Sequence, residues 1–168
     1  LAGLACSALA HAGTADDRFR AIYQQEWSWR IGQAGIVASG ESQPNNGRLD
    51  TVDAASQQQR LDYWRNVLKQ LDGVDATALS RANQVNYAIY RDQISNFVAN
   101  QRFKNWQMPF NSDSAFWSDI GYELGGDRLR TAGDYRKYLD RLEQIPAYVD
   151  QQIANMQLGL QRGFSVPR

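Results

Sequence analysis

The sequence predicts an all-α protein: an antiparallel helical bundle with a long Pro-kinked C-terminal helix and an aromatic-rich irregular connection. Three observations support this class. Apolar residues recur at spacings of three and four in several separate stretches, which is the period of a helix buried on one face. No stretch shows the sustained alternation that a half-buried strand requires. A short turn at Asp72-Gly73 separates two of the helical stretches, which favours an antiparallel hairpin.

The first helix is expected over residues 14–39. Asp16 and Asp17 lie in its first turn, where the helix dipole favours negative charge. The residues of its predicted inner stripe fall on neighbouring turns: Phe19, Ile22, Tyr23, Glu26, Trp27 and Arg30. Glycines weaken its far end, and the stretch that follows contains the turn signal Asn46-Gly47. A loop is therefore predicted there.

The second helix is expected over residues 53–71, or from Thr51, and the third over residues 77–100, or from Asp75. Each of these starting residues is of a type that caps helices. The stripe of the second helix consists of Leu61, Trp64, Leu68 and Leu71. The third helix carries a wider apolar face and is predicted to be buried on more than one side: Leu79, Ala82, Val85, Asn86, Ile89, Tyr90, Ile94, Phe97 and Val98.

Residues 102–130 interrupt the helical pattern with aromatic residues, Pro109 and several glycines, and a short helix is plausible over residues 114–124. Aromatic side chains bind apolar or sugar surfaces, so five of them are candidate substrate-binding residues: Trp106, Phe110, Phe116, Trp117 and Tyr122. The other interpretation is a packed connection that closes over the hairpin. It is favoured because exposed aromatic patches are usually avoided.

Carboxylate pairs are the remaining candidates for acid–base chemistry, as in glycosidases. Asp113 with Asp119, or Glu123 with Asp127, would form such a pair, but each residue also suits a helix cap or a solvated face. On the third helix, Tyr87, Tyr90 and Arg91 also suggest binding. Their helical spacing instead favours core and rim positions, with Arg91 pairing to an acid. The sequence therefore predicts no catalytic residue in this chain.

The C-terminal stretch, residues 131–168, has the densest helical signals and is predicted to form one long helix or two abutting ones. Thr131 and Asp134 resemble a capping box, and Pro146 is expected to kink the helix or open a new one. Gly163 suits a left-handed C-cap. The apolar stripe comprises Tyr135, Tyr138, Leu139, Leu142, Ile145, Val149, Ile153, Met156 and Leu160.

Residues 1–12 are small and apolar and end in Ala10-His11-Ala12, the cleavage pattern of a secretory signal peptide. An ordinary apolar helix is the alternative, and Cys6 raises a weaker lipoprotein interpretation. Residues 13–168 would then be the mature helical region, and its location periplasmic or secreted. No other stretch approaches the run of about 20 apolar residues that a membrane span needs.

Composition excludes several classes of site. Cys6 and His11 are the only cysteine and histidine of the 168 residues, so a chain cleaved after Ala12 has no thiol nucleophile, His-based triad, or His- or Cys-based zinc site. The 18 basic residues balance the 18 acidic residues with no long run of either sign, which gives no electrostatic footprint for nucleic acid.

The C-terminal stretch also carries the motifs of a known family. They are Leu129-x-Thr131-Ala132-x-Asp134-Tyr135-x-x-Tyr138-Leu139-x-Arg141-Leu142, then Ile145-Pro146-Ala147-Tyr148-x-Asp150-Gln151-x-Ile153-Ala154-Asn155, then Gly159-x-x-Arg162-Gly163-Phe164-x-x-Pro167-Arg168. Upstream, Leu61-Asp62-Tyr63, Asn86-Tyr87-Ala88-Ile89 and Trp106-x-Met108-Pro109 agree in type. In these residues the chain resembles the N-terminal half of bacterial proteins of the domain-of-unknown-function 885 family.

This resemblance implies a largely helical, exported parent placed with the gluzincin-like zinc metallopeptidases. Their His-Glu-x-x-His motif lies in a later region, so no zinc ligand or catalytic residue carries over to this chain. The resemblance implies a non-catalytic region that scaffolds or lids the cleft of a missing C-terminal catalytic part, with a peptide as the substrate class. Self-association through exposed apolar faces is expected. The alternative is a stand-alone periplasmic helical module that binds a ligand in the aromatic interval, and a carboxylate-based hydrolase is the third possibility.

Overall fold

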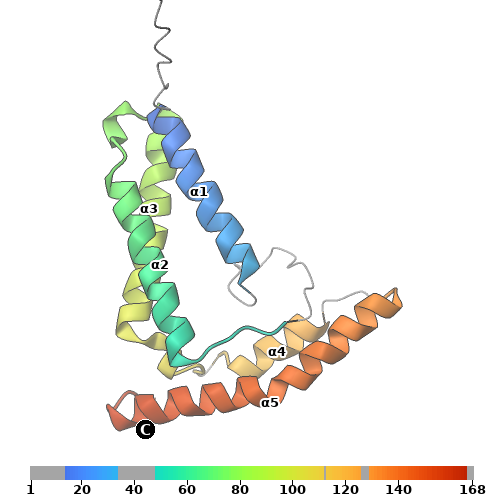
Figure 1. The fold of residues 1–168 in the computed structure, drawn as a ribbon. Helices are drawn as coiled ribbons and strands as arrows, with labels where there is room; N and C mark the ends of the chain where they lie inside the picture. The colour runs from blue at the N-terminus through green and yellow to red at the C-terminus, as the bar shows by residue number, and fades with distance from the viewer. Residues whose placement is uncertain (1–13, 34–47, 112, 126–128, 166–168) are drawn as a thin grey trace, which may run out of the picture.

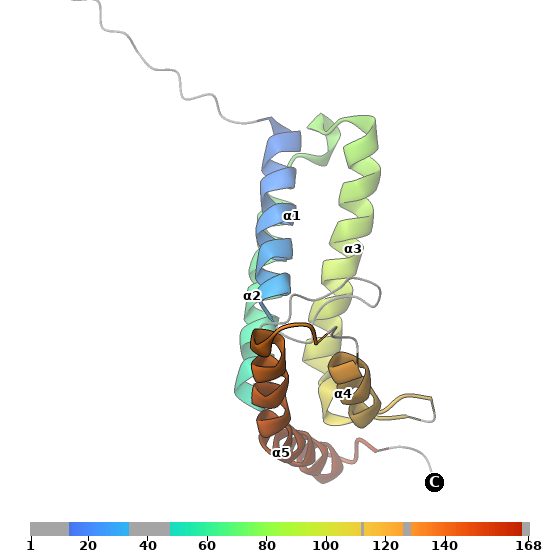
Figure 2. The ribbon, with the colours of Figure 1, turned by 90° about the vertical axis from the view of Figure 1, so that its right-hand side faces the viewer.

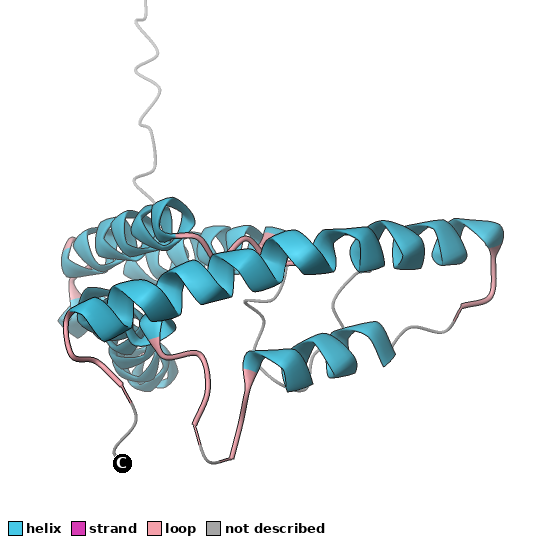
Figure 3. Ribbon diagram, turned by 90° about the horizontal axis from the view of Figure 1, so that it is seen from below, coloured by secondary structure: helices cyan, strands magenta, loops and turns pink. Residues whose placement is uncertain are grey.

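The computed structural model describes residues 14–33, 48–111, 113–125 and 129–165, and its described residues form an all-α fold. Helices α1 (Ala15–Gly32), α2 (Ala54–Asp72) and α3 (Arg81–Phe103) run side by side, each antiparallel to the next along the chain (Figure 1). The long helix α5 (Ala132–Gln161) crosses one end of this three-helix unit, and the short α4 (Phe116–Gly125) lies near it (Figures 1 and 3).

Local capping residues set the helix starts that the sequence predicts. Thr14 and Asp17 form a capping box at α1, Asp53 accepts from the backbone N–H groups of Ala55 and Ser56 at α2, and Thr131 and Asp134 form the box at α5. These bonds satisfy donors at each helix start that have no partner within the helix.

Two predicted boundaries differ from the structure. Helix α1 ends at Gly32, because Gln33 is extended; residues 34–39 of the expected helix lie outside the described residues. The third helix begins later than expected. Asp75 caps only the 3₁₀ turn η1 (Ala76–Ala78), and Ser80 caps α3 after an extended residue at Leu79.

The core lies where α1, α2 and α3 meet, and α2 packs most closely on α3. Leu71 and Ile94 are completely buried, and each such side chain contributes about 1.5–3 kcal/mol relative to an exposed one. Aromatic rings link the three helices: Phe19 of α1 meets Tyr87 and Tyr90 of α3 edge-on, and Trp64 of α2 contacts Phe97. The α2–α3 hairpin and α1 therefore share one core.

The expectation that α3 is buried on more than one side is wrong in this structure. Val85 and Ile89 are 57% and 65% exposed, because α1 and α2 cover only one side of α3. In the view of Figure 2, α1 overlaps α2 and α3 lies to one side of both, so one side of α3 faces away from them.

Helix α5 is one continuous helix with Pro146 inside it, and it bends near its middle (Figure 1). The bend agrees with the predicted kink, since proline removes a backbone hydrogen bond and crowds the preceding turn. Gly163 adopts φ +74° just beyond the helix, in the left-handed conformation predicted for a C-cap.

Candidate functional site

A fully buried carboxylate lies at the centre of the three-helix unit. Glu26 accepts two bonds from the Arg30 guanidinium, with Nε–Oε1 at 2.9 Å and Nη2–Oε2 at 2.6 Å. Trp64 donates its indole N–H from α2 at 3.2 Å, and Tyr90 donates its hydroxyl from α3 at 3.0 Å. One acid on α1 thus binds partners from all three helices.

The surroundings of Glu26 keep the Tyr90 hydroxyl protonated. Burial, and then the nearby Glu26 charge, raise the pKa of the Tyr90 hydroxyl well above its usual range, so Tyr90 remains a donor. The Arg30 guanidinium lies over the rings of Trp27 and Phe97, at 5.5 and 5.0 Å from their centroids. Because both carboxylate oxygens are bound and screened from water, the network is suited to holding helices together rather than to proton transfer.

The other residues singled out on α3 have structural partners. Tyr87 donates its hydroxyl to the backbone oxygen of Leu71 at 3.0 Å. Arg91 pairs with Asp72, with Nη2–Oδ1 at 2.8 Å, as its predicted pairing to an acid requires. Sequence patterning placed Glu26, Arg30 and Tyr90 on inner stripes, but it did not predict that they bind one another.

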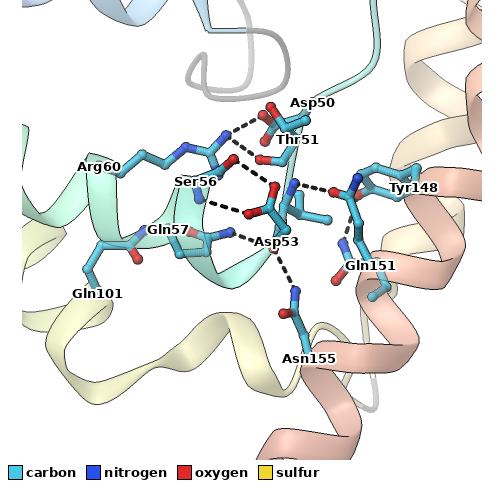
Figure 4. Close-up of polar contacts among 12 residues, drawn as sticks. Asp50, Thr51, Asp53, Ser56, Gln57, Arg60, Gln101, Tyr148, Gln151 and Asn155 are labelled. Atoms are coloured by element: carbon cyan, nitrogen blue, oxygen red, sulfur yellow. Dashed lines mark hydrogen bonds and ion pairs between the residues drawn. The ribbon is translucent and has the colours of Figure 1, made fainter.

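A second polar cluster joins α5 to the chain before α2 (Figure 4). Gln144 and Gln151 of α5 accept from the backbone N–H groups of Leu49 and Val52, at 3.0 and 2.8 Å. Asn155, also on α5, donates to the backbone oxygen of Val52 at 2.7 Å and is almost completely buried. The amide side chains of α5 therefore satisfy an extended segment that has no strand partner among the described residues.

The start of α2 completes this joint. Arg60 forms an ion pair with Asp50 and donates to the Thr51 backbone oxygen at 2.8 Å, and Gln57 donates to Val52 O at 3.4 Å (Figure 4). At the far end of α5, Gly159 lies directly against the 3₁₀ turn η2 (Asn105–Gln107). The C-terminal half of α5 is thus attached through polar and backbone contacts.

The structure brings three of the five predicted substrate-binding residues together: Phe110, Phe116 and Trp117. Phe116 and Trp117 meet edge-on at 5.1 Å between ring centroids, Phe110 is 6.1 Å from Trp117, and Phe116 reaches Tyr148 of α5 at 6.2 Å. Trp106 lies elsewhere, on η2 beside the ends of α2 and α3, and the Tyr122 side chain lies outside the described residues.

The described residues provide no support for acid–base or metal chemistry. Asp113 is exposed, the side chains of Asp119 and Glu123 lie outside the described part of the chain, and so does Asp127. Within the described ranges, no three His, Cys, Asp or Glu side chains cluster as metal ligands, so they do not fit a zinc ion. None of the described helices is long and apolar enough to span a bilayer; the signal-peptide stretch, residues 1–12, lies outside the described residues.

Grooves lined by described residues open on the surface of the three-helix unit, and two of them bear on function. The larger, the α1–α3 groove, has a volume of about 570 Å³ and is lined by Phe19, Arg20, Tyr23, Gln24, Asn83, Asn86, Ile89, Tyr90 and Gln93. The smaller, the basic groove, has a volume of about 190 Å³ and is lined by Ala54, Gln57, Gln58, Leu61, Arg65, Gln101, Arg102, Lys104 and Trp106. Trp106 alone of the predicted binding residues lines either one.

Helix α5 has the reverse of the polarity expected for a helix at a core. Its buried residues are Arg141, Gln152, Asn155 and Gly159, which are polar or lack a side chain. Its predicted apolar stripe faces away from these residues and is covered only in part. Four of its residues are between 42% and 69% exposed: Tyr135, Leu139, Ile153 and Leu160. The other five are half-buried: Tyr138, Leu142, Ile145, Val149 and Met156.

A family model described as "Bacterial protein of unknown function (DUF885)" matches residues 32–168. No curated protein and no solved structure matches the chain. The match includes α2, α3, α4 and α5, and with them the polar cluster that joins α5 to the chain before α2. Nearly all of α1 precedes the match. The chain therefore belongs to the DUF885 family of bacterial proteins of unknown function.

Proposed function

We propose that this chain is the non-catalytic helical N-terminal region of an exported zinc-metallopeptidase-like protein. Its role is to wall or lid the cleft of a catalytic part that lies outside these 168 residues. The single observation that carries the proposal is the apolar stripe of α5, which the described residues leave partly exposed from Tyr135 to Leu160. A stripe of this kind on a helix already held by its opposite face marks a surface for another protein segment.

The length of the stripe favours a folded partner over a small ligand. From Tyr135 to Leu160 the helix spans about 38 Å at a rise of 1.5 Å per residue. Small-molecule sites are concave pockets, whereas this surface is one convex helix. A helical or sheet surface of the same larger protein would cover it, and the family resemblance supplies zinc peptidase chemistry as the partner's activity.

A first prediction concerns the stripe itself. Leu139→Glu with Leu160→Glu is expected to abolish self-association of the purified chain, because two charges in an apolar contact lose their hydration. The matched control is Ala147→Glu with Ala154→Glu, which adds the same charges to exposed positions on the same helix but off the stripe. Light scattering after size exclusion, at micromolar concentration, measures the mass of each variant.

The same two pairs of substitutions test the proposal in the larger protein. Reading the gene beyond the codon for Arg168 shows whether an open frame encodes His-Glu-x-x-His. If it does, the stripe variant should lower the melting temperature and the metal-dependent peptide hydrolysis of the full product, while the control leaves both unchanged. Metal-dependent hydrolysis by the 168-residue chain alone, or an equal effect of both pairs, would contradict the proposal.

The α1–α3 groove favours a second candidate function, a helical module that binds a small ligand. Its volume lies within the roughly 300–1,000 Å³ of small-molecule sites, and its aromatic floor is bordered by amide side chains. Such a lining suits a peptide or a sugar, which presents both apolar faces and hydrogen-bonding groups. This groove replaces the aromatic interval as the place where the module would bind.

The second candidate predicts that a ligand raises the melting temperature of the chain, since binding to the folded state alone stabilises it. The test is a panel of short peptides and sugars. A member that binds should add about 2.7 kcal/mol to the free energy of unfolding when its concentration is about 100 times its dissociation constant. Tyr23→Ala, at a half-exposed groove residue, is expected to remove the shift, while Trp117→Ala, outside both grooves, preserves it. A panel with no shift, or a shift insensitive to Tyr23→Ala, counts against this function.

A further inference from the structure

The basic groove brings three cations and a tryptophan together from separate elements. Arg65 comes from α2, Arg102 from the last turn of α3, Lys104 from its C-cap, and Trp106 from η2. No acidic side chain lines the groove. Arg65 has one exposed ion pair with Asp62 at 3.5 Å, and no described carboxylate pairs with Arg102 or Lys104. The groove therefore has an excess of positive charge.

Lys104 has a left-handed backbone conformation, which is unusual for a lysine. It has φ +61° and ψ +46°, and it is the single described non-glycine residue with positive φ. Glycine, or sometimes asparagine, is usual at this position because a side chain is unfavourable in the left-handed conformation. The dipole of α3 accounts for a basic residue such as Arg102 within the last turn, but it does not account for a lysine at the left-handed position. A costly residue whose side chain lines a groove indicates a role beyond the fold.

Gln101, one of the residues that line the groove, has a side-chain acceptor without a donor. Gln101 donates to Gln57 Oε1 at 3.0 Å, but its own Oε1 is buried and has no hydrogen-bond partner among the described residues. Figure 4 shows Gln101 beside Gln57 at the start of α2. An orphaned buried acceptor is costly and is satisfied by an N–H or O–H group. A ligand whose negative charge meets the cations would satisfy this oxygen if it carried a donor nearby and the Gln101 amide opened toward the groove.

We propose that the basic groove binds the C-terminal residue of a peptide. That residue carries an amide N–H for Gln101 Oε1 and a carboxylate for Lys104 and Arg102, and its side chain would lie against Leu61 and Trp106. Inorganic phosphate and acetate match the cations but offer no such N–H group. The volume of about 190 Å³ is below the usual range for small-molecule sites, which suits one terminal residue rather than a folded segment.

This site does not rest on the proposed role of α5. All its lining residues lie between Ala54 and Trp106, and none belongs to the apolar stripe. If the peptide does not bind here, the proposed role of the α5 stripe is unaffected. If the stripe proves to have no partner, the residues that line this groove stay as they are.

The experiment uses the whole chain and a matched pair of probes, N-acetyl-leucyl-leucine and the same dipeptide with a C-terminal amide. Binding is followed by backbone amide resonances. The free acid is expected to shift the signals of Gln101, Lys104 and Trp106 and to bind at least about tenfold more tightly than the amide, since hydrogen bonds between charged partners are the strong class. Its affinity should fall with added salt, because the cations are exposed.

Lys104→Gly provides the decisive variant because glycine relieves the left-handed backbone. Its melting temperature should equal or exceed that of the wild type, while its affinity for the free acid falls at least about fivefold. Lys69→Gln removes the same charge from an exposed site on α2 outside the groove and should leave the affinity unchanged. The proposal is overturned if the amide or inorganic phosphate binds as tightly as the free acid, or if Lys104→Gly binds like the wild type.

Discussion

Replacing Glu26 with leucine is expected to cost about 3–5 kcal/mol of unfolding free energy, the usual effect of removing one partner of a buried ion pair. Arg30 would keep its charge with a side chain only 4% exposed, and Trp64 and Tyr90 would each lose an acceptor. Domains of this size have about 5–15 kcal/mol in total, so the variant should lose a large share of its stability. Urea unfolding at pH 7, followed by circular dichroism, measures the loss.

A double variant separates the buried charge from the packing. Glu26→Leu with Arg30→Met replaces the whole pair by apolar side chains, and such replacements are often neutral or stabilising when they pack well. It should therefore be more stable than Glu26→Leu alone. Glu26→Leu with a cost below about 1 kcal/mol, or a double variant less stable than the single, would mean that the network does not hold the three helices together.

The starts of α2 and α5 were predictable because their causes are local. Asp53 caps α2 with its own side chain, and Thr131 and Asp134 exchange bonds over three residues, so nothing distant is needed. The start of α3 was missed for a related reason. Asp75 is also a good cap, and sequence alone does not show that its turn stops after Ala78 and that Ser80 begins the helix.

Which face of a helix is covered depends on partners distant in the sequence. The period of three and four residues locates the apolar stripe of α5, but it does not state that a neighbour faces it. In the structure the opposite face docks instead, because the backbone of Leu49 and Val52 needs polar partners and Gln144, Gln151 and Asn155 provide them. These contacts join residues about a hundred positions apart.

A change of backbone direction after α3 separates Trp106 from the other described aromatic residues of the predicted site. The left-handed residue Lys104 and the turn η2 change the direction of the chain after α3. Trp106 therefore lies by the end of the hairpin, while Phe110, Phe116 and Trp117 continue toward α5. No pattern of aromatic spacing predicts such a turn, because lysine rarely adopts this conformation. The basic groove had a signal in the sequence, since Arg102 and Lys104 place two positive charges within three residues.

Gly159→Ala is expected to destabilise the attachment of α5 by about 1–3 kcal/mol, the usual cost of overpacking, although alanine normally favours a helix by about 1 kcal/mol. A Cβ atom at this position would lie 2.7 Å from the Gln107 backbone oxygen and 3.2 Å from that of Phe164. Both neighbours are backbone, so the helix or η2 must move. The changes should appear in urea unfolding and in the resonances around Gln107.

Gly133→Ala is the matched control, in the same helix, because its Cβ atom would make only an ordinary contact of 3.5 Å with Thr131 Oγ1. It should leave stability unchanged or raise it slightly through the higher helix propensity of alanine. If both variants behave alike, close packing on η2 is not what holds α5. If only Gly159→Ala loses stability, the C-terminal half of α5 is fixed by backbone contact, and its partly exposed apolar face is displayed at a defined angle to the three-helix unit.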